Sequence, residues 1–132
     1  MTLPAEEQRA TEPADERLPV RLARLRAEID AAATAAGRDP ADVALLLATK
    51  TQSADRISAA ITAGYPLIGE NRVQEVLAKA DDLAAMPHQL HFIGHLQNNK
   101  VNLLLPHITC LQTLDSLELA RKLDSRLDLL DR

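Results

Sequence analysis

The hydrophobic and polar positions of this chain follow two different periodicities. In the first region apolar residues recur every three or four positions, at Leu22, Leu25, Ile29, Ala32 and Ala36. This spacing predicts one apolar stripe of an amphipathic helix, which Gly37 is placed to end. From Val43 to Ala48 every position is apolar, a pattern typical of a parallel strand that is covered on both faces.

The same change of pattern repeats along the rest of the chain. It predicts, in order, helix 53–63, strand 65–69, helix 72–84, strand 90–94, helix 98–105, strand 107–113 and a last helix that begins at a capping pattern over residues 115–118. The side chains expected to face the core are Ile57, Ala60, Ile61, Val73, Leu77, Ala80, Leu123, Leu127 and Leu130, with Leu119 or Ala120. Strict alternation with short connections implies parallel strands joined by right-handed crossovers.

Two α/β architectures accommodate these strand–helix units: an open doubly wound sheet, or part of a (β/α)8 barrel. No G-x-G-x-x-G pattern follows the first strand, which disfavours the dinucleotide-binding form of the open sheet. A chain of 132 residues is long enough for one domain. Residues 1–17 are rich in Pro, Glu and Arg and are expected to form a disordered tail, which leaves residues 18–132 as the folded domain.

Composition excludes several functions. A net charge of −4 argues against a nucleic-acid interface, and the cluster Arg21, Arg24 and Arg26 is expected on the solvated side of the first helix. No apolar run approaches the length of about 18 residues that a membrane span requires. Cys110 is the only cysteine, so no internal disulfide can form and a reducing cytoplasm is the expected location.

Polar residues follow each apolar run, at the strand ends where α/β proteins bind ligands. Lys50 is the sharpest candidate because it lies just beyond the run from Val43 to Ala48. A lysine beside an apolar core has its charged form disfavoured, and the neutral amine can form a Schiff base with a carbonyl group. The alternative is a lysine whose stem covers apolar surface while its ammonium group reaches solvent.

Asn71 and the residues beside it also allow two interpretations. With Gln74 three residues later, Asn71 is placed to cap helix 72–84, and its amide could equally face a ligand. Glu70 and Arg72 are expected to pair with each other or with solvent. At the start of the next helix, Gln97, Asn98 and Asn99 are candidates for capping or for binding an anion.

Three histidines lie close together in the sequence, at His88, His91 and His95. No cysteine or carboxylate accompanies them at the spacing of metal ligands, so no metal site is predicted. His91 is expected to be a hydrogen-bonded histidine of strand 90–94.

Three motifs in register resemble the pyridoxal phosphate (PLP) homeostasis proteins, which are single-domain relatives of the barrel domain of alanine racemase. The motifs are LLLATKTQ (45–52), IGENRVQE (68–75) and LHFIGHLQNNK (90–100), and the resemblance extends from about residue 20 to residue 125. It implies an α/β fold of parallel (β/α) units that form about half of a TIM-type (β/α)8 barrel. Where this chain has ATK, many members have VSK, a change that keeps the amine.

The resemblance also implies a site and a role. Lys50 would hold PLP as a Schiff base, Asn71 would lie near the cofactor, and His91 and Ile93 would lie beside or beneath its ring. The implied function is PLP binding and homeostasis rather than turnover. In the family the later half of the barrel supplies the loops that hold the phosphate, so residues 18–132 would be the N-terminal half of the barrel.

Two other functions remain open from the sequence. A PLP-dependent racemase would need a further domain that supplies a base, typically a tyrosine, and Tyr65 precedes strand two at the wrong end for that role. A cofactor-free half-barrel that self-associates is the second alternative. In a half-barrel the first and fourth strands would be open edges, which favours self-association.

Overall fold

The computed structural model describes residues 14–132. Its first helix, α2, spans Ala14–Ala35, so residues 14–17 are helical and do not belong to the predicted tail. The rest of that predicted tail, residues 1–13, lies outside the described residues. The helix ends where the sequence predicted, at Gly37, whose positive φ of 73° is the conformation that a helix-terminating glycine adopts. Among the described residues, no helix has the length and apolar character needed to cross a membrane.

Two details of α2 differ from the sequence-based expectation. Leu22 and Ala33 are buried, whereas Leu25 is 41% exposed, so the buried stripe is displaced from the predicted one. Arg26 does not lie on a solvated face: its guanidinium donates to Val43 O at 2.7 Å and to Pro40 O at 2.9 Å, and it pairs with Asp30. Arg26 therefore attaches α2 to the segment that leads into the first strand.

Four parallel strands form one sheet in the order β1-β2-β3-β4, which is also their order along the chain. The strands are β1 (Leu47–Ala48), β2 (Leu67–Glu70), β3 (Gln89–Phe92) and β4 (Cys110–Leu111). The outer strands β1 and β4 are shorter than predicted. Each has only one neighbouring strand in the described sheet. Its length is therefore set by the two residues that pair with that neighbour.

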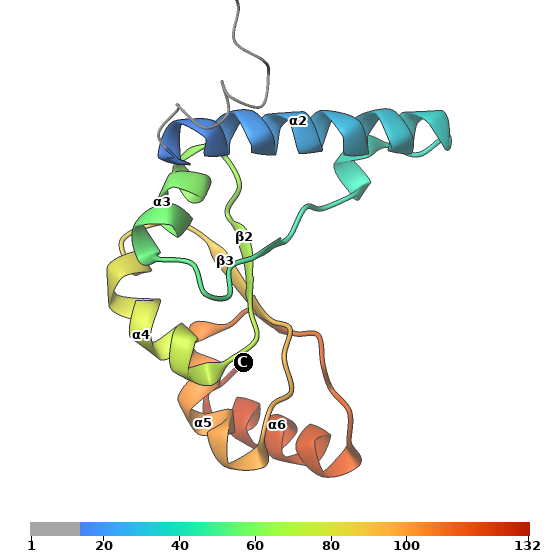
Figure 1. Cartoon of the computed structure of the whole chain (residues 1–132). Coiled ribbons are helices and arrows are strands. Elements are labelled where there is room, and N and C mark those ends of the chain that lie inside the picture. Colours follow the sequence, from blue (N-terminus) through green and yellow to red (C-terminus); the bar gives the residue numbers. More distant parts are fainter. Residues whose placement is uncertain (1–13) are drawn as a thin grey trace, which may run out of the picture.

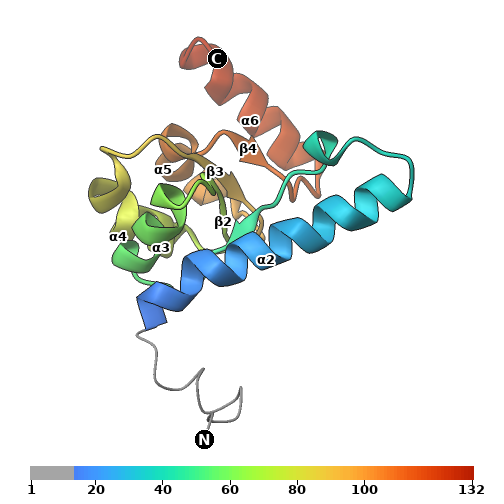
Figure 2. The ribbon, with the colours of Figure 1, turned by 90° about the horizontal axis from the view of Figure 1, so that it is seen from above.

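Helices connect the strands on one side of the sheet. They are α3 (Ala54–Thr62), α4 (Val73–Leu83), the short helical segment made of η2 (Asn98–Lys100), α5 (Val101–Leu104) and η3 (Leu105–His107), and α6 (Leu117–Leu129). Figure 2 shows α3, α4, α5 and α6 following one another around this side. In Figure 1, α2 lies across the end of the sheet where β2 begins, and it contacts α3 and the 3-10 turn η1 (Pro40–Asp42).

The hydrophobic core fills the space between the sheet and these helices. Ile68 on β2 and Leu90 and Phe92 on β3 are at most 7% exposed. They pack against buried residues of the helices and of the turn before β4, namely Ile57, Ile61, Val76, Leu83, Val101, Leu104, Leu105, Ile108 and Leu119. On α4, Val73 packs against the core as predicted, but Val76 is buried in place of the predicted Leu77, which is 38% exposed.

The chain is thus an α/β protein whose four (β/α) units form about half of a TIM-type barrel. The sheet order without a reversal distinguishes it from the open doubly wound alternative, in which the strand order changes direction. In this architecture one face of every strand packs on the helices and the other faces the barrel interior.

Candidate functional site

The face of the sheet opposite the helices carries the candidate site. Ala48, Gly69, His91 and Cys110 are partners in the strand register and lie side by side on this surface, which we call the inner face. Side chains alternate between the two faces of a strand, so Leu90 and Phe92 point to the helices while His91 and Ile93 follow the inner face.

Lys50, Asn71 and Ile93 lie two residues beyond Ala48, Gly69 and His91. Of the four residues predicted for the site, His91 lies on the inner face by its register, and the other three follow the carboxyl ends of β1, β2 and β3 at one edge of the sheet. Two glycines permit the close packing of this edge. A Cβ atom on Gly69 would lie 2.6 Å from a methyl group of Leu46, and one on Gly94 would collide with the backbone of Asn71.

Lys50 is exposed and its ammonium group makes no hydrogen bond or ion pair within the part of the chain that is described. The apolar surroundings expected from the preceding run are not present, because Ala48 is exposed as well. β1 is an edge strand of the described sheet and pairs only with β2, which leaves this end of the strand open to solvent. The amine is therefore accessible to a ligand.

Asn71 does not cap α4. Arg72 is the N-cap residue of this helix, and its side chain makes no capping bond. The Asn71 side chain instead has a buried Oδ1 atom without a hydrogen-bond partner. A buried carbonyl oxygen without a donor is uncommon in folded proteins and often marks a place where a further group binds.

His91 and Ile93 continue the same surface. The His91 Nδ1 atom lies 2.9 Å from Nε2 of Gln112, as expected for a hydrogen-bonded strand histidine. Gln112, which follows β4, therefore belongs to the site and was not singled out from the sequence. Ile93 packs toward Gly69, where its Cδ1 would lie 3.1 Å from an added Cβ.

The histidines do not converge. His88 Nδ1 lies 2.8 Å from Met86 O, and His95 Nδ1 lies 3.1 Å from Asp115 Oδ2. Across residues 14–132 no group of three His, Cys, Asp or Glu side chains could hold a metal ion. Gln97 is the N-cap residue of η2 without a side-chain capping bond, so the capping role considered for it is absent.

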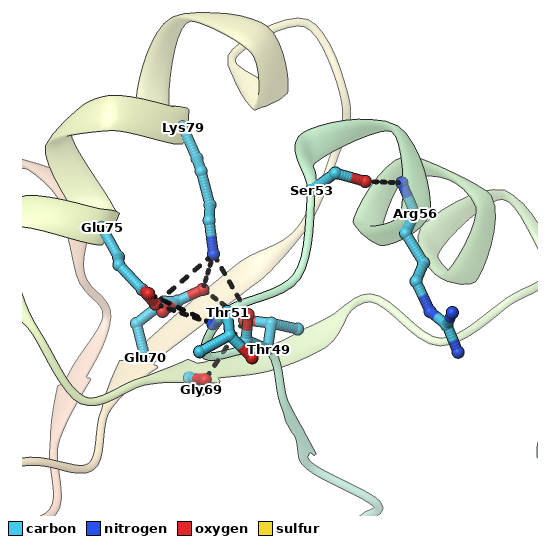
Figure 3. Close-up of polar contacts among 8 residues, drawn as sticks. All are labelled: Thr49, Thr51, Ser53, Arg56, Gly69, Glu70, Glu75 and Lys79. Carbon is cyan, nitrogen blue, oxygen red and sulfur yellow. Dashed lines mark hydrogen bonds and ion pairs between the residues drawn. The ribbon is translucent and has the colours of Figure 1, made fainter.

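A polar network behind Lys50 was not predicted from the sequence (Figure 3). The Thr49 hydroxyl donates to Glu70 Oε1 at 2.6 Å, and Lys79 Nζ donates to the same oxygen at 2.8 Å. The Thr51 amide donates to both oxygens of Glu75 at 3.1 Å. Glu70 does not pair with Arg72, contrary to expectation, because it lies on the helix side of β2 where α4 covers it and leaves it 2% exposed.

The two carboxyl groups of this network have opposite pKa shifts. Burial raises the pKa of Glu70 above its ordinary value, although the bonds from Lys79 and Thr49 oppose this. The hydrogen bond with Glu70 lowers the pKa of Glu75, helped by the Thr51 amide and the Lys79 charge. The two shifts favour a proton on Glu70 over one on Glu75.

A cavity of about 200 Å³ lies on the other side of the sheet, between β2, β3 and α4. Its lining includes Glu70, Lys79 and Leu83 and none of the four predicted site residues. The cavity is a gap between the sheet and its helices and is distinct from the inner face.

No family profile matches the chain. In sequence it is similar to the pyridoxal phosphate homeostasis protein of Pseudomonas aeruginosa, with 41% identity over 105 residues that cover 80% of this chain and 46% of the relative. Its fold is similar to an unknown protein from Bifidobacterium adolescentis, with a TM-score of 0.82, 38% identity and coverage of 91% and 53% of the two chains. PipY of Synechococcus elongatus, solved with PLP bound, gives a TM-score of 0.74, 34% identity and coverage of 86% and 50%. The chain spans about half the length of the curated relatives it matches.

Proposed function

The chain belongs to the family of pyridoxal phosphate homeostasis proteins, and on this premise we propose that it contributes the lysine-bearing half of a PLP-binding barrel. Lys50 binds the aldehyde of PLP as a Schiff base in the full-length gene product. The observation that supports this proposal is the position of Lys50: a free, accessible amine that follows the carboxyl end of β1.

The other residues of the inner face fit a planar, polar cofactor. The unpartnered Asn71 Oδ1 is available to a donor group of the ligand. His91 on β3 offers a flat ring, and Ile93, one residue past the end of β3, offers an aliphatic surface. The hydrogen bond with Gln112 holds the His91 ring in place. Bound PLP supplies an electrophilic aldehyde and an electron-withdrawing ring. The chain orients that ring and offers the amine.

We also propose that this protein holds PLP without turning over amino acids. Racemisation generally needs an acid–base group on each side of the substrate carbon. Tyr65 lies just before β2, at the opposite end of the strand from Asn71, and cannot act beside Lys50. With PLP present, the Cα protons of alanine and serine should exchange with deuterium no faster than in a Lys50→Ala control. Rapid exchange that depends on Lys50 would favour the racemase function instead.

Self-association is a further property we propose for the 132-residue chain on its own. Strands β1 and β4 are the edges of the described sheet, and the inner face between them is only partly covered. Open edges of this kind pair with other chains. Sedimentation should detect dimers or larger species, whereas a monomer across the micromolar range would contradict the proposal. The cytoplasmic location expected from Cys110 stays a prediction.

A PLP titration of the full-length gene product tests the main proposal. Binding should produce a saturable change in the absorbance of the PLP chromophore. Lys50→Arg keeps the charge and removes the nucleophile, so this variant should lose the change, while Lys100→Arg serves as a matched control that retains it. Retention of the spectrum in Lys50→Arg would overturn the assignment of the lysine.

A further inference from the structure

Lys50 has a free side chain, but the backbone on both sides of it is tethered. On one side, Thr49 donates its hydroxyl to Glu70 Oε1, and its carbonyl accepts from Lys79 Nζ at 3.1 Å. On the other side, the Thr51 amide donates to Glu75. All these partners come from β2 and α4, the next β/α unit along the chain (Figure 3).

The backbone at Thr51 is in an unusual conformation. Its φ is 64°, in the left-handed region, where a β-branched residue is an outlier. Such a conformation persists only when its surroundings hold it. The chain leaves β1 through a turn that the backbone bond from Gln52 N to Thr49 O closes at 3.1 Å. The three-centre bond from the Thr51 amide to Glu75 is the side-chain contact that holds this turn against α4.

The two carboxyl groups form one unit with Lys79. Glu70 Oε2 is buried and has no hydrogen-bond partner, and burial raises the pKa of Glu70, which favours its protonated form. Lys79 lies 2.8 Å from Glu70 Oε1 and 3.6 Å from Glu75 Oε2. With Glu70 protonated, the charges of Glu75 and Lys79 cancel, the arrangement that burial favours.

We propose that the Glu70–Glu75 carboxyl pair is a positioning device for Lys50. The pair fixes Thr49 and Thr51 in the turn that directs the Lys50 amine to the inner face, and neither carboxyl group touches the ligand. The proposal rests on the function proposed above, in which Lys50 binds the PLP aldehyde. Pre-organisation of this kind raises affinity because fewer conformations of the amine are lost on binding.

Three variants of the full-length gene product test the proposal. Glu75→Ala removes the acceptor of the Thr51 amide. Glu70→Gln keeps an acceptor for Thr49 and Lys79 and a donor for Glu75, so it mimics the protonated carboxyl group. Glu118→Ala changes an exposed carboxylate in the first turn of α6 and is the matched control.

The first readout needs no cofactor: hydrogen exchange of the Thr51 amide in the apo protein, followed by NMR. The second is the apparent Kd for PLP. Loss of one charge-assisted hydrogen bond in Glu75→Ala should accelerate exchange at Thr51, and weaken PLP binding, by about tenfold to 100-fold. In Glu70→Gln, the exchange rate at Thr51 and the Kd for PLP should each stay within about twofold of the parent protein. The same is expected of Glu118→Ala. Urea unfolding of each variant shows that it is folded.

Unchanged exchange and unchanged affinity in Glu75→Ala would overturn the proposal. Faster exchange with unchanged affinity would overturn it too, because the turn would then be tethered without positioning the amine. A loss in Glu70→Gln as large as in Glu75→Ala would contradict the proposal that the neutral form of Glu70 supports the turn. Failure of the parent protein to bind PLP would refute the proposed function instead, and exchange at Thr51 alone would then decide whether the tether exists.

Discussion

The two faces of the sheet differ although they are built from alternating residues of the same strands. On β3, Phe92 faces the helices and is fully buried, while its neighbour His91 lies on the inner face and is only partly covered. The helix side is closed by apolar side chains of α3, α4, α5 and α6. The inner face is lined by small, polar or half-exposed groups, and the free amine of Lys50 follows its first strand.

The contrast shows where packing is satisfied and where it is not. Among the described residues, three buried side-chain atoms lack a hydrogen-bond partner, and two of them, Glu70 Oε2 and Asn71 Oδ1, lie at the carboxyl end of β2. The outlying backbone of Thr51 is at the neighbouring end of β1. Strain and unpartnered polar atoms collect at functional sites. The closed face provides the stability on which this open edge depends.

The largest expected effect is on the closed face. Phe92→Ala removes a fully buried ring and should lower the free energy of unfolding by about 3–5 kcal/mol. His91→Ala, one residue earlier on the inner face, should cost less than about 1 kcal/mol. Urea unfolding of both variants measures the difference. Equal losses would mean that the inner face is packed as tightly as the core.

A smaller effect is expected where the strand ends meet. Gly94→Ala places a methyl group against the Asn71 backbone, which cannot yield easily, and should lower the free energy of unfolding by about 1–3 kcal/mol. Gly69→Ala meets the side chains of Leu46 and Ile93, which can rotate, and should cost less. Chemical denaturation ranks the two variants. A larger loss for Gly69→Ala would contradict the close approach of Gly94 and Asn71.

The segment that enters β1 gives the third test. Arg26→Ala removes the bonds that attach α2 to Val43 and Pro40 and should cost about 1–2 kcal/mol. Arg24→Ala is the matched control on the same helix, since Arg24 makes only a 3.6 Å contact with Glu28 and is well exposed. Thermal unfolding should separate the two, and equal midpoints would show that this attachment adds nothing to stability.

The smallest effect is a dependence on pH. The raised pKa of Glu70 means that the folded chain keeps a proton that the unfolded chain loses near its ordinary value of 4.5. The stabilisation from Glu70 is therefore complete below that value and declines as pH rises toward the folded pKa. The lowered pKa of Glu75 acts in the opposite sense, and its contribution is lost as pH falls below 4.5.

Glu70→Gln separates the two contributions. Its free energy of unfolding, relative to the parent protein, should increase as pH rises above 4.5, because only the parent protein loses the contribution of the protonated carboxyl group. Urea unfolding between pH 4 and pH 8 measures this difference. A difference that does not change with pH would show that Glu70 is not protonated in the folded state.

Hydropathy alone predicted much of the fold. Mainly apolar segments located all four strands, although only the first is apolar at every position. The helical spacing of Ile57, Ala60 and Ile61 identified the buried face of α3, and Lys50 follows β1 as expected. On α4, Leu77 was predicted to face the core in place of Val76, because the two are adjacent apolar residues and periodicity cannot choose between two neighbouring apolar stripes. Edge strands were predicted too long because composition does not show how many neighbours a strand has.

The supporting network could not be predicted because it depends on tertiary contacts. Glu70 is a charged residue at the end of an apolar run, which usually indicates exposure, yet α4 folds back over it. The bond between Thr51 and Glu75 joins residues 24 positions apart. One feature was available: Glu75 and Lys79 are four residues apart on a helix, the spacing of an ion pair, and Glu70 lies just before that helix.

Borohydride reduction of the full-length gene product with PLP, followed by peptide mapping, tests most directly whether the inner face is a PLP site. Reduction converts a Schiff base into a stable pyridoxyl label on the lysine that formed it. We expect the label on Lys50 in the peptide that contains Thr49 and Thr51. Label on Lys79, Lys100 or Lys122 with Lys50 unmodified would contradict the assignment. It would mean that PLP does not bind at the inner face through Lys50.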